Sequence, residues 1–317
     1  MSRIVSLAAW VAVQAALVAP AAMAQESVKL NMVPLPSTRQ QLDVAMDMRM
    51  NMSMKLPADA TEQAKAQAQQ MKASMPITMK MAMRQDLSTT ARQPDGGYTL
   101  NAEVTSLKNE MRDGTGQTRA LPQQGAIRFS ARLKDDQFEK IDLQLPPSAQ
   151  AQALSKEMQE KIFNQSFDWM RKFNGMTLKV GETVEVPIDM NLPTGNAPTG
   201  KLLGKYTLTG VNKGVASFDV AVRMDVNFAV PAPASAPSAA AAAPAQGAMS
   251  GSGTGKMDLR LADRLMLRST MAMTMGMDIA GPQGNMRMDM DMTMTSTGKA
   301  LPVGKKPAAP AKPAPKG

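Results

Sequence analysis

The chain has 317 residues, a formal net charge of +9, and neither cysteine nor histidine. It therefore lacks disulfides, thiol and imidazole catalysts, and the common zinc or copper sites built from these residues. Aromatic residues make up only 3% of the chain and no phosphate-binding glycine loop is present. We therefore expect neither an enzyme nor a nucleic-acid-binding protein, and we expect no cofactor.

The N-terminus has the three parts of a secretory signal peptide. A single arginine precedes the apolar run Ile4–Val18, which is followed by the small-residue end Ala22-Met23-Ala24. A membrane anchor is the alternative, but Gln14 and Pro20 interrupt a run that would need about 20 apolar residues to span a bilayer. Residues 1–24 are therefore predicted to be a signal peptide cleaved after Ala24, which places the mature protein in the periplasm. No later run is long enough to span a membrane.

Apolar and polar residues alternate with a period of two through most of the mature sequence. From Leu42 to Leu56 every even position is apolar and the odd positions are mostly polar, which predicts a long strand with one buried and one wet face. Short turns such as Asp95-Gly96-Gly97 indicate antiparallel pairing. The same alternation predicts strands at Met75–Met83, Tyr98–Val104, Ile127–Leu133, Phe138–Leu145, Val184–Leu192, Tyr206–Leu208, Ala216–Phe228, Met257–Leu261, Met271–Ile279 and Met286–Met294.

Two segments have helical patterns. Residues 58–73 are rich in Ala, Gln and Lys, which predicts a helix that begins near Asp59. Residues 148–173 carry apolar side chains at spacings of three and four, which predicts an amphipathic helix docked on a sheet face. Residues 231–255 have an Ala/Pro/Ser/Gly composition and are expected to form a flexible loop, while residues 298–317 are predicted to be a disordered Pro/Lys/Ala tail.

Together these elements predict a mainly β fold with two helices, in a single domain of residues 25–297. About eleven antiparallel strands with one apolar face have to curl, close or be covered. We therefore expect a curled antiparallel sheet or half-barrel covered by an amphipathic helix. Arg3 is removed with the signal peptide and five lysines lie in the tail, so the mature body carries only +3. The tail is expected to be simply solvated, or to make weak contact with anionic envelope surfaces.

Long curled strands with a helix in the apolar hollow resemble the periplasmic lipoprotein-carrier (LolA/LolB-like) half-barrel. Turn and strand motifs of the second half also resemble an uncharacterised family of exported bacterial β-sheet proteins. These motifs are Leu178-Lys179-Val180-Gly181-Glu182-Thr183, Gly204-Lys205-Tyr206-Thr207-Leu208 and Gly214-Val215-Ala216. The resemblance implies fold and compartment, no catalytic residue, and, for the lipoprotein carriers, a hydrophobic ligand by analogy.

Methionine is concentrated in four of the predicted strands. Eighteen of the 31 methionines lie at Met46–Met54, Met75–Met83, Met271–Met277 and Met286–Met294, whereas other strands use Val, Ile and Phe on their apolar face. Methionine is not a favoured strand residue, so this concentration indicates local selection. If the first and last strands meet in the curled sheet, the four strands form one continuous apolar surface.

Three interpretations of this surface remain open. Methionine fills irregular gaps in a packed structural core, lines a hollow for a hydrophobic or lipid-like guest, or uses its sulfur to bind Cu(I) or to scavenge oxidants. The prediction for function is a non-enzymatic periplasmic protein whose partner is a hydrophobic small molecule or lipid. No catalytic, cofactor or organised metal site is expected. The predicted ligand-lining residues are Met46, Met48, Met50, Met52, Met79, Met81, Met83, Met271, Met273, Met275, Met288, Met290 and Met292.

Overall fold

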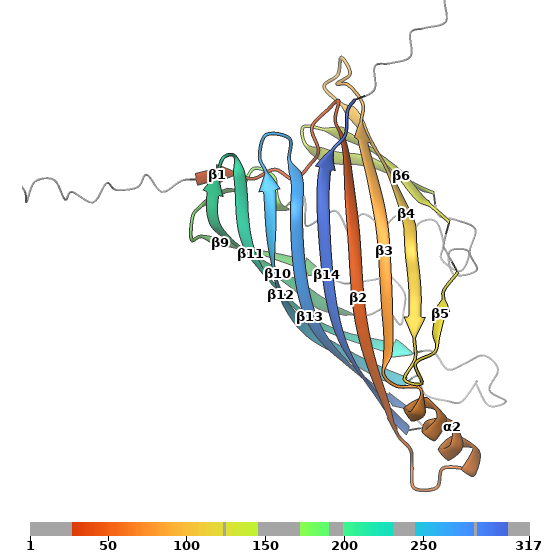
Figure 1. Cartoon of the computed structure of the whole chain (residues 1–317). Coiled ribbons are helices and arrows are strands. Elements are labelled where there is room, and N and C mark those ends of the chain that lie inside the picture. The colour runs from red at the N-terminus through yellow and green to blue at the C-terminus, as the bar shows by residue number, and fades with distance from the viewer. Residues whose placement is uncertain are drawn as a thin grey trace, which may run out of the picture.

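The computed structural model describes residues 27–122, 125–144, 172–189, 199–230, 245–281 and 284–303. In this part of the chain a twelve-stranded antiparallel sheet dominates, accompanied by a two-stranded sheet and one helix (Figure 1). The mainly β antiparallel fold predicted from the sequence is confirmed. The sheet is strongly curved and is not closed, since its path ends at two different strands, β7 and β9.

The sheet consists of two meanders joined at one seam. Its strands follow the order β7-β6-β4-β3-β2-β14-β13-β12-β11-β10-β9, and the short β5 pairs with β4. All neighbours along this path are consecutive long strands of the sequence except β2 and β14, which lie near the two ends of the described chain. The strands of the large sheet are β2 (Arg39–Lys55), β3 (Ile77–Thr89), β4 (Tyr98–Arg112), β5 (Thr118–Ala120), β6 (Ile127–Lys134), β7 (Gln137–Gln144), β9 (Thr183–Asp189), β10 (Thr199–Asn212), β11 (Val215–Val230), β12 (Ala245–Arg260), β13 (Leu265–Gly281) and β14 (Gly284–Ala300).

The predicted alternation separates two chemically different faces of the sheet. The outward face carries cross-strand ion pairs, among them Arg84 with Asp43 at 2.8 Å and Arg128 with Glu103 at 3.1 Å. The inward face carries the apolar partners of the same strands. Because side chains alternate between faces along a strand, each long strand contributes to both surfaces at once.

Strand β12 corrects one expectation from the sequence. Residues 231–255 were expected to be a loop, but Ala245–Arg260 pairs along its length with both β11 and β13. The reason is that Gly251, Gly253 and Gly255 lie on the inward face and have no side chains. The residues of β13 opposite them occupy the space that side chains would take. An added Cβ on Gly253 would lie 2.4 Å from Met273 Cγ, and one on Gly255 would lie 2.0 Å from the Thr270 carbonyl oxygen. Residues 231–244 lie outside the described part.

Two hydrophobic cores close one end of the sheet. The first joins β9, β10, β11 and β12 to the small sheet of β1 (Ser27–Lys29) and β8 (Thr177–Lys179), and includes Phe173, Leu208 and Phe218. The second joins β4, β6 and β7 around Tyr98 and Leu133, with Val33 packed against them. Met271 packs against the first core, so the methionine strands continue the same inward face away from it.

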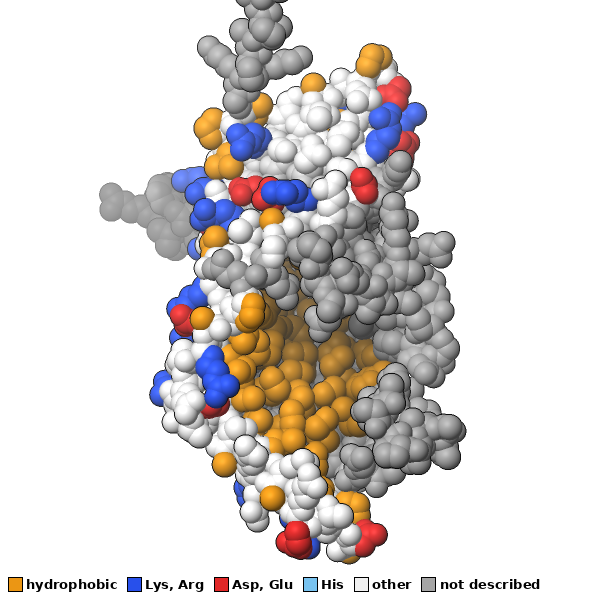
Figure 2. All heavy atoms as spheres, turned by 90° about the vertical axis from the view of Figure 1, so that its right-hand side faces the viewer, with side chains coloured by type: hydrophobic (Ala, Val, Ile, Leu, Met, Phe, Trp, Pro, Cys, Tyr) orange, Lys and Arg blue, Asp and Glu red, His pale blue; other side chains and the backbone are white. Residues whose placement is uncertain are grey.

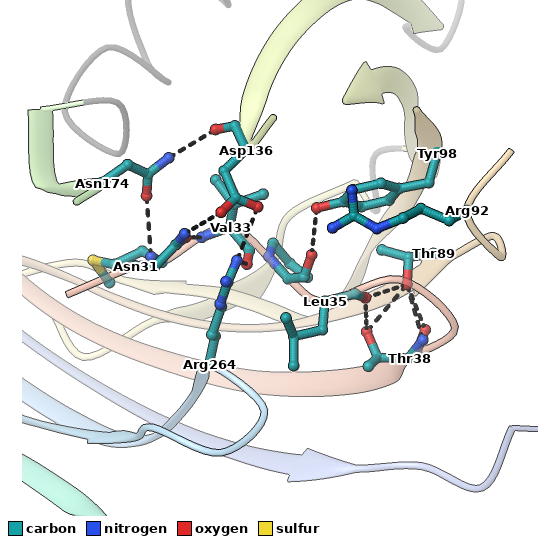
Figure 3. Close-up of polar contacts among 12 residues, drawn as sticks. Asn31, Val33, Leu35, Thr38, Thr89, Arg92, Tyr98, Asp136, Asn174 and Arg264 are labelled. Atoms are coloured by element: carbon teal, nitrogen blue, oxygen red, sulfur yellow. Dashed lines mark hydrogen bonds and ion pairs between the residues drawn. The ribbon is translucent and has the colours of Figure 1, made fainter. Parts of the chain in front are cut away.

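The segment between β1 and β2 links these two cores through polar contacts (Figure 3). Arg264, in the turn between β12 and β13, donates from Nη1 to the Val33 carbonyl and to Asp136 Oδ1, each at 3.0 Å. Asp136 also accepts from Asn31, and the buried Tyr98 hydroxyl donates to the Pro34 carbonyl at 2.9 Å. These contacts hold three distant parts of the chain together at the closed end.

The helix predicted at residues 58–73 is confirmed as α2 (Glu62–Ala73). It begins three residues later than expected because the Thr61 side chain accepts from the Ala64 N–H and caps it. None of its residues is buried, so α2 does not cover the sheet face.

Of the second predicted helix, residues 148–171 lie outside the described part, as do the predicted signal peptide and residues 304–317. Strand β14 extends to Ala300, three residues beyond the predicted end of the domain. In the described residues, no helix has the length and hydropathy needed to cross a membrane.

Candidate functional site: a methionine-lined hollow

The four methionine-rich strands are neighbours in the centre of the sheet, in the order β3-β2-β14-β13. This adjacency, expected if the first and last strands meet, is confirmed by the pairing of β2 with β14. Along this seam Met46, Met48, Met50, Met52 and Met54 stand opposite Met294, Met292, Met290, Met288 and Met286 in turn. The seam between the two meanders is therefore methionine against methionine over five successive pairs.

The register aligns the methionines in rows that cross the sheet. Met48 stands opposite Met79 of β3 and Met292 of β14, and Met292 stands opposite Met273 of β13. Side chains directly opposed across strands have Cβ atoms about 4.5–5.5 Å apart, so each row is a continuous band of thioethers. The rows from β3 to β13 are Met81–Met46–Met294–Met271, Met79–Met48–Met292–Met273 and Ile77–Met50–Met290–Met275, continued without β3 by Met52–Met288–Met277 and Met54–Met286–Ile279.

The site prediction is thereby placed on one surface. Twelve of the thirteen predicted residues belong to these rows, and Met83 stands opposite Val44 in the next row toward the cores. We call the surface formed by the five rows the methionine face. Figure 2 shows hydrophobic side chains gathered in a hollow, with charged side chains on the outer flank of the molecule. The outward neighbours of the rows include Asp47 and Lys80, whose side chains pair on the opposite face of the sheet.

The methionines of this face are neither fully buried nor fully exposed. All thirteen predicted lining residues are partly buried, and Met54 at the far end of the face is 37% exposed. By contrast, Met257, which belongs to the first core, is only 6% exposed. The same residue type is thus buried at the closed end and half-accessible in the hollow.

Strand β12 places three glycines beside the methionines of β13. Gly251, Gly253 and Gly255 stand opposite Met275, Met273 and Met271. An added Cβ at Gly251 would lie 2.7 Å from Met275 Cγ, so the thioether side chains lie over bare backbone. This arrangement allows the sheet to curl tightly toward its inward face.

The prediction from the sequence missed three methionines that continue these rows onto neighbouring strands. Met111 of β4 stands opposite Met79, and Met249 of β12 stands opposite Met277. Met224 of β11 stands opposite Gly251 in the same way. The signal for β12 was its period of two, with glycine or methionine at every odd position from 247 to 257, but its Gly/Ser composition resembled a loop.

Few polar groups accompany these rows. Ser269 and Ser296, on the inward face next to the first core, share a hydrogen bond of 2.8 Å between their hydroxyls. Asn109 of β4 stands opposite Met81, in the row of Met46, and its buried Oδ1 has no hydrogen-bond partner. Asn109 was not among the residues predicted from the sequence, because a single amide among alternating residues gives no pattern.

Charge is confined to the outward side of these strands. Hydrogen bonds from Arg84 hold the pKa of the Asp43 carboxyl below its usual value, and bonding to Asp289 raises the pKa of Arg287. No group of three or more metal-ligating His, Cys, Asp or Glu residues occurs within the described ranges. A depression of about 670 Å³ crosses β2, β3, β12, β13 and β14 at the level of the row Met79–Met48–Met292–Met273.

The chain matches no protein-family model, and no curated protein shows significant similarity to it.

Proposed function

We propose that this is an exported, non-enzymatic periplasmic protein that binds a hydrophobic or lipid-like ligand on the methionine face. The observation that supports this most directly is the half-burial of a continuous apolar surface inside a concave sheet. Soluble proteins rarely leave a contiguous apolar patch of this kind open unless it binds something. The LolA/LolB-like resemblance agrees with a ligand of this class by analogy of fold.

The residue type suits a guest of variable shape. Methionine has an unbranched, flexible side chain that adapts to irregular partners, whereas Val and Ile are stiff. From Met46 to Met54 the face extends over about 26 Å at a rise near 3.3 Å per residue. One leaflet of a bilayer core is about 15 Å deep, so an extended acyl chain fits along the face.

The amphipathic segment of residues 148–173 is proposed to cover the hollow. Its last apolar residue, Phe173, is 1% exposed in the first core and makes an edge-to-face contact with Tyr206, with ring centroids 4.6 Å apart. Tyr206 stands opposite Val220, in line with the row of Met271. Phe173, at the C-terminal end of the segment, is therefore anchored beside the hollow, and the proposed covering helix would run back from it over the methionine face.

Ligand binding can be separated from core packing by substitution. Nile red, a neutral hydrophobic dye, is expected to bind the delipidated protein saturably, with a blue-shifted emission. Replacing Met48, Met81, Met273 and Met290 with glutamine should weaken binding at least tenfold while the melting temperature changes little, because a hollow that is covered but not filled admits water and keeps the amides hydrated.

Two controls accompany this test. The same four residues changed to leucine keep the face apolar and should keep binding, and outward-facing Thr254, Thr274 and Thr293 changed to glutamine should bind like the wild type. A packed structural core would instead lose several kcal/mol of stability, at about 1–3 kcal/mol for each buried amide. That result, or the absence of saturable binding by the wild type, would contradict the proposal.

The aligned rows favour one alternative function, binding of a soft metal ion. Rows such as Met79–Met48–Met292–Met273 bring thioethers of adjacent strands together, and thioethers favour Cu(I). We expect only weak Cu(I) binding in an anaerobic titration, because no charged or imidazole ligand organises the site. Tight stoichiometric binding that disappears when the methionines of β13 and β14 become leucine would replace ligand binding by copper handling. Rapid sulfoxide formation at those methionines in the folded protein would favour an oxidant sink.

A further inference from the structure

Asn109 is the one polar side chain among the residues that the register places in the five methionine rows and their continuations on β4, β11 and β12. The row that contains it runs Asn109–Met81–Met46–Met294–Met271–Gly255–Val220. Its neighbours in sequence, Lys108 and Glu110, form an ion pair at 2.9 Å on the outward side of β4. The amide thus lies on the inward face, in the same row as four methionines.

The side-chain oxygen of Asn109, Oδ1, is shielded from solvent and accepts no hydrogen bond. Almost all buried polar atoms in proteins have a partner, because an unpaired one loses its hydration without compensation. The Asn109 oxygen is the sole buried side-chain nitrogen or oxygen atom in this condition within the described residues. An acceptor left unpaired at the edge of an apolar face is what a ligand with one matching donor would satisfy.

The rest of the face limits the charge of that ligand. None of the residues aligned in the five rows is Lys, Arg, Asp or Glu. An ionised headgroup placed there would lose its hydration and find no counter-charge. A neutral donor, a hydroxyl or an amide N–H, gains the Asn109 oxygen without this penalty.

We infer that the ligand is a neutral aliphatic chain that carries a hydroxyl or amide N–H, and that Asn109 Oδ1 accepts a hydrogen bond from this group. The inference rests on the proposed function, since it concerns the same hollow. Met81 stands directly opposite Asn109 across the ladder. Its flexible thioether can move aside to admit the donor. The methionine rows then hold the chain, and Asn109 sets the position of its polar group along the face.

The test compares two ligands that differ by the donor alone. Dodecan-1-ol and its isomeric ether, 1-methoxyundecane, compete with Nile red for the wild-type protein. The alcohol should bind about 3- to 10-fold more tightly than the ether, the range expected of one neutral hydrogen bond. Ionised dodecanoate should bind more weakly than the alcohol.

Asn109→Leu, which keeps the branched shape and the number of heavy atoms and has no amide, should remove the preference for the alcohol and leave ether binding unchanged. Its melting temperature without ligand should equal or exceed that of the wild type, because an unpaired polar atom is removed. The matched control is Ser269→Ala, since the Ser269 hydroxyl is already bonded to Ser296. This variant should keep the preference.

The outcomes separate the two proposals. Equal binding of alcohol and ether by the wild type, or an unchanged preference in Asn109→Leu, would overturn the role of Asn109 while leaving the hollow as a binding site. A large fall in the melting temperature of Asn109→Leu would also overturn it, because the amide would then be bonded within the protein. If Nile red does not bind the wild type, the proposed function itself fails.

Discussion

Methionine behaves differently at different positions of this chain, and its surroundings decide how. Met257 lies in a core beside Phe218 and Leu259 and is closed off from solvent. Met48 and Met292, opposed on the seam, remain partly exposed in the hollow. A flexible side chain on a concave surface can fill space or yield it, which Val or Ile cannot do to the same degree.

A second residue-scale feature concerns the turn between β12 and β13. Asp263 accepts hydrogen bonds from Arg260 Nε at 2.8 Å and Nη2 at 2.6 Å, and these bonds hold the pKa of its carboxyl below the usual 3.8. A carboxylate with a lowered pKa stabilises the folded protein above its unfolded pKa. This contribution to stability is lost as the pH falls through the lowered pKa of Asp263 in the folded protein.

Asp263→Asn is therefore expected to lower the free energy of unfolding by about 0.5–1.5 kcal/mol at pH 7 and to have little effect near pH 2. Urea unfolding of both proteins at the two pH values measures the difference. Asp59→Asn, at an exposed position before α2, serves as the control. A difference that persisted at the acidic pH would show that lost packing, not lost charge, is the cause.

At the scale of elements, glycine positions determine how β12 can curve. Three inward glycines take the places where other strands carry methionine, and the side chains of β13 lie over them. Outward positions of the same strand from 250 to 256 are Ser, Thr and Lys, as on any solvated face. A segment with a loop-like composition thus forms a long strand because its neighbours supply the side chains it lacks.

Gly255→Ala is expected to destabilise the protein by about 1–3 kcal/mol, because the new Cβ meets a backbone oxygen that cannot easily move. Thermal or urea unfolding measures the loss. The control is Gly210→Ala on β10, where nothing lies within 4 Å of an added Cβ. The control should change stability by no more than about 0.5 kcal/mol. Similar losses in the two variants would mean that glycine matters through backbone freedom and not through the curl of β12.

At the scale of the whole molecule, the methionine face exists because two meanders meet. One meander runs from β2 to β7 and the other from β14 back to β9. Each meander alone would expose the methionines of β2 or β14 on an edge strand. Pairing of these two strands places their methionines in the middle of the sheet. The cores at Tyr98 and Phe218 stabilise one end, so the hollow can remain apolar without being filled.

Export of the whole molecule gives a prediction that depends on the N-terminus alone. The mature protein should begin at Gln25 and occur in the periplasmic fraction, because Ala22 and Ala24 provide the small residues that a signal peptidase requires. Intact-mass measurement of the exported protein checks this directly. Retention of residues 1–24 together with membrane partitioning would contradict it.

Periodicity was enough to predict most of the long strands, and composition was enough to predict α2. Alternation from Leu42 to Leu56 and from Met286 to Met294 corresponds to β2 and β14, because a strand with one buried face must alternate. Strands of three residues, such as β1 and β8, were not predicted, because they are too short to show a period and form by pairing with each other. The covering of the sheet by residues 148–173 stays a prediction, because residues 148–171 lie outside the described part of the chain.

Side-chain alternation is a local property of the backbone, so the amino-acid sequence was enough to predict a β-sheet protein with methionine on one face of four strands. The tertiary structure alone decided that these strands are adjacent, that glycines of β12 flank them, and that Asn109 lies in their row with an unpaired oxygen. The physical reason is that strand pairing between the two ends of the chain is a long-range choice. It is made by burying both apolar faces together, and no short stretch of sequence encodes it.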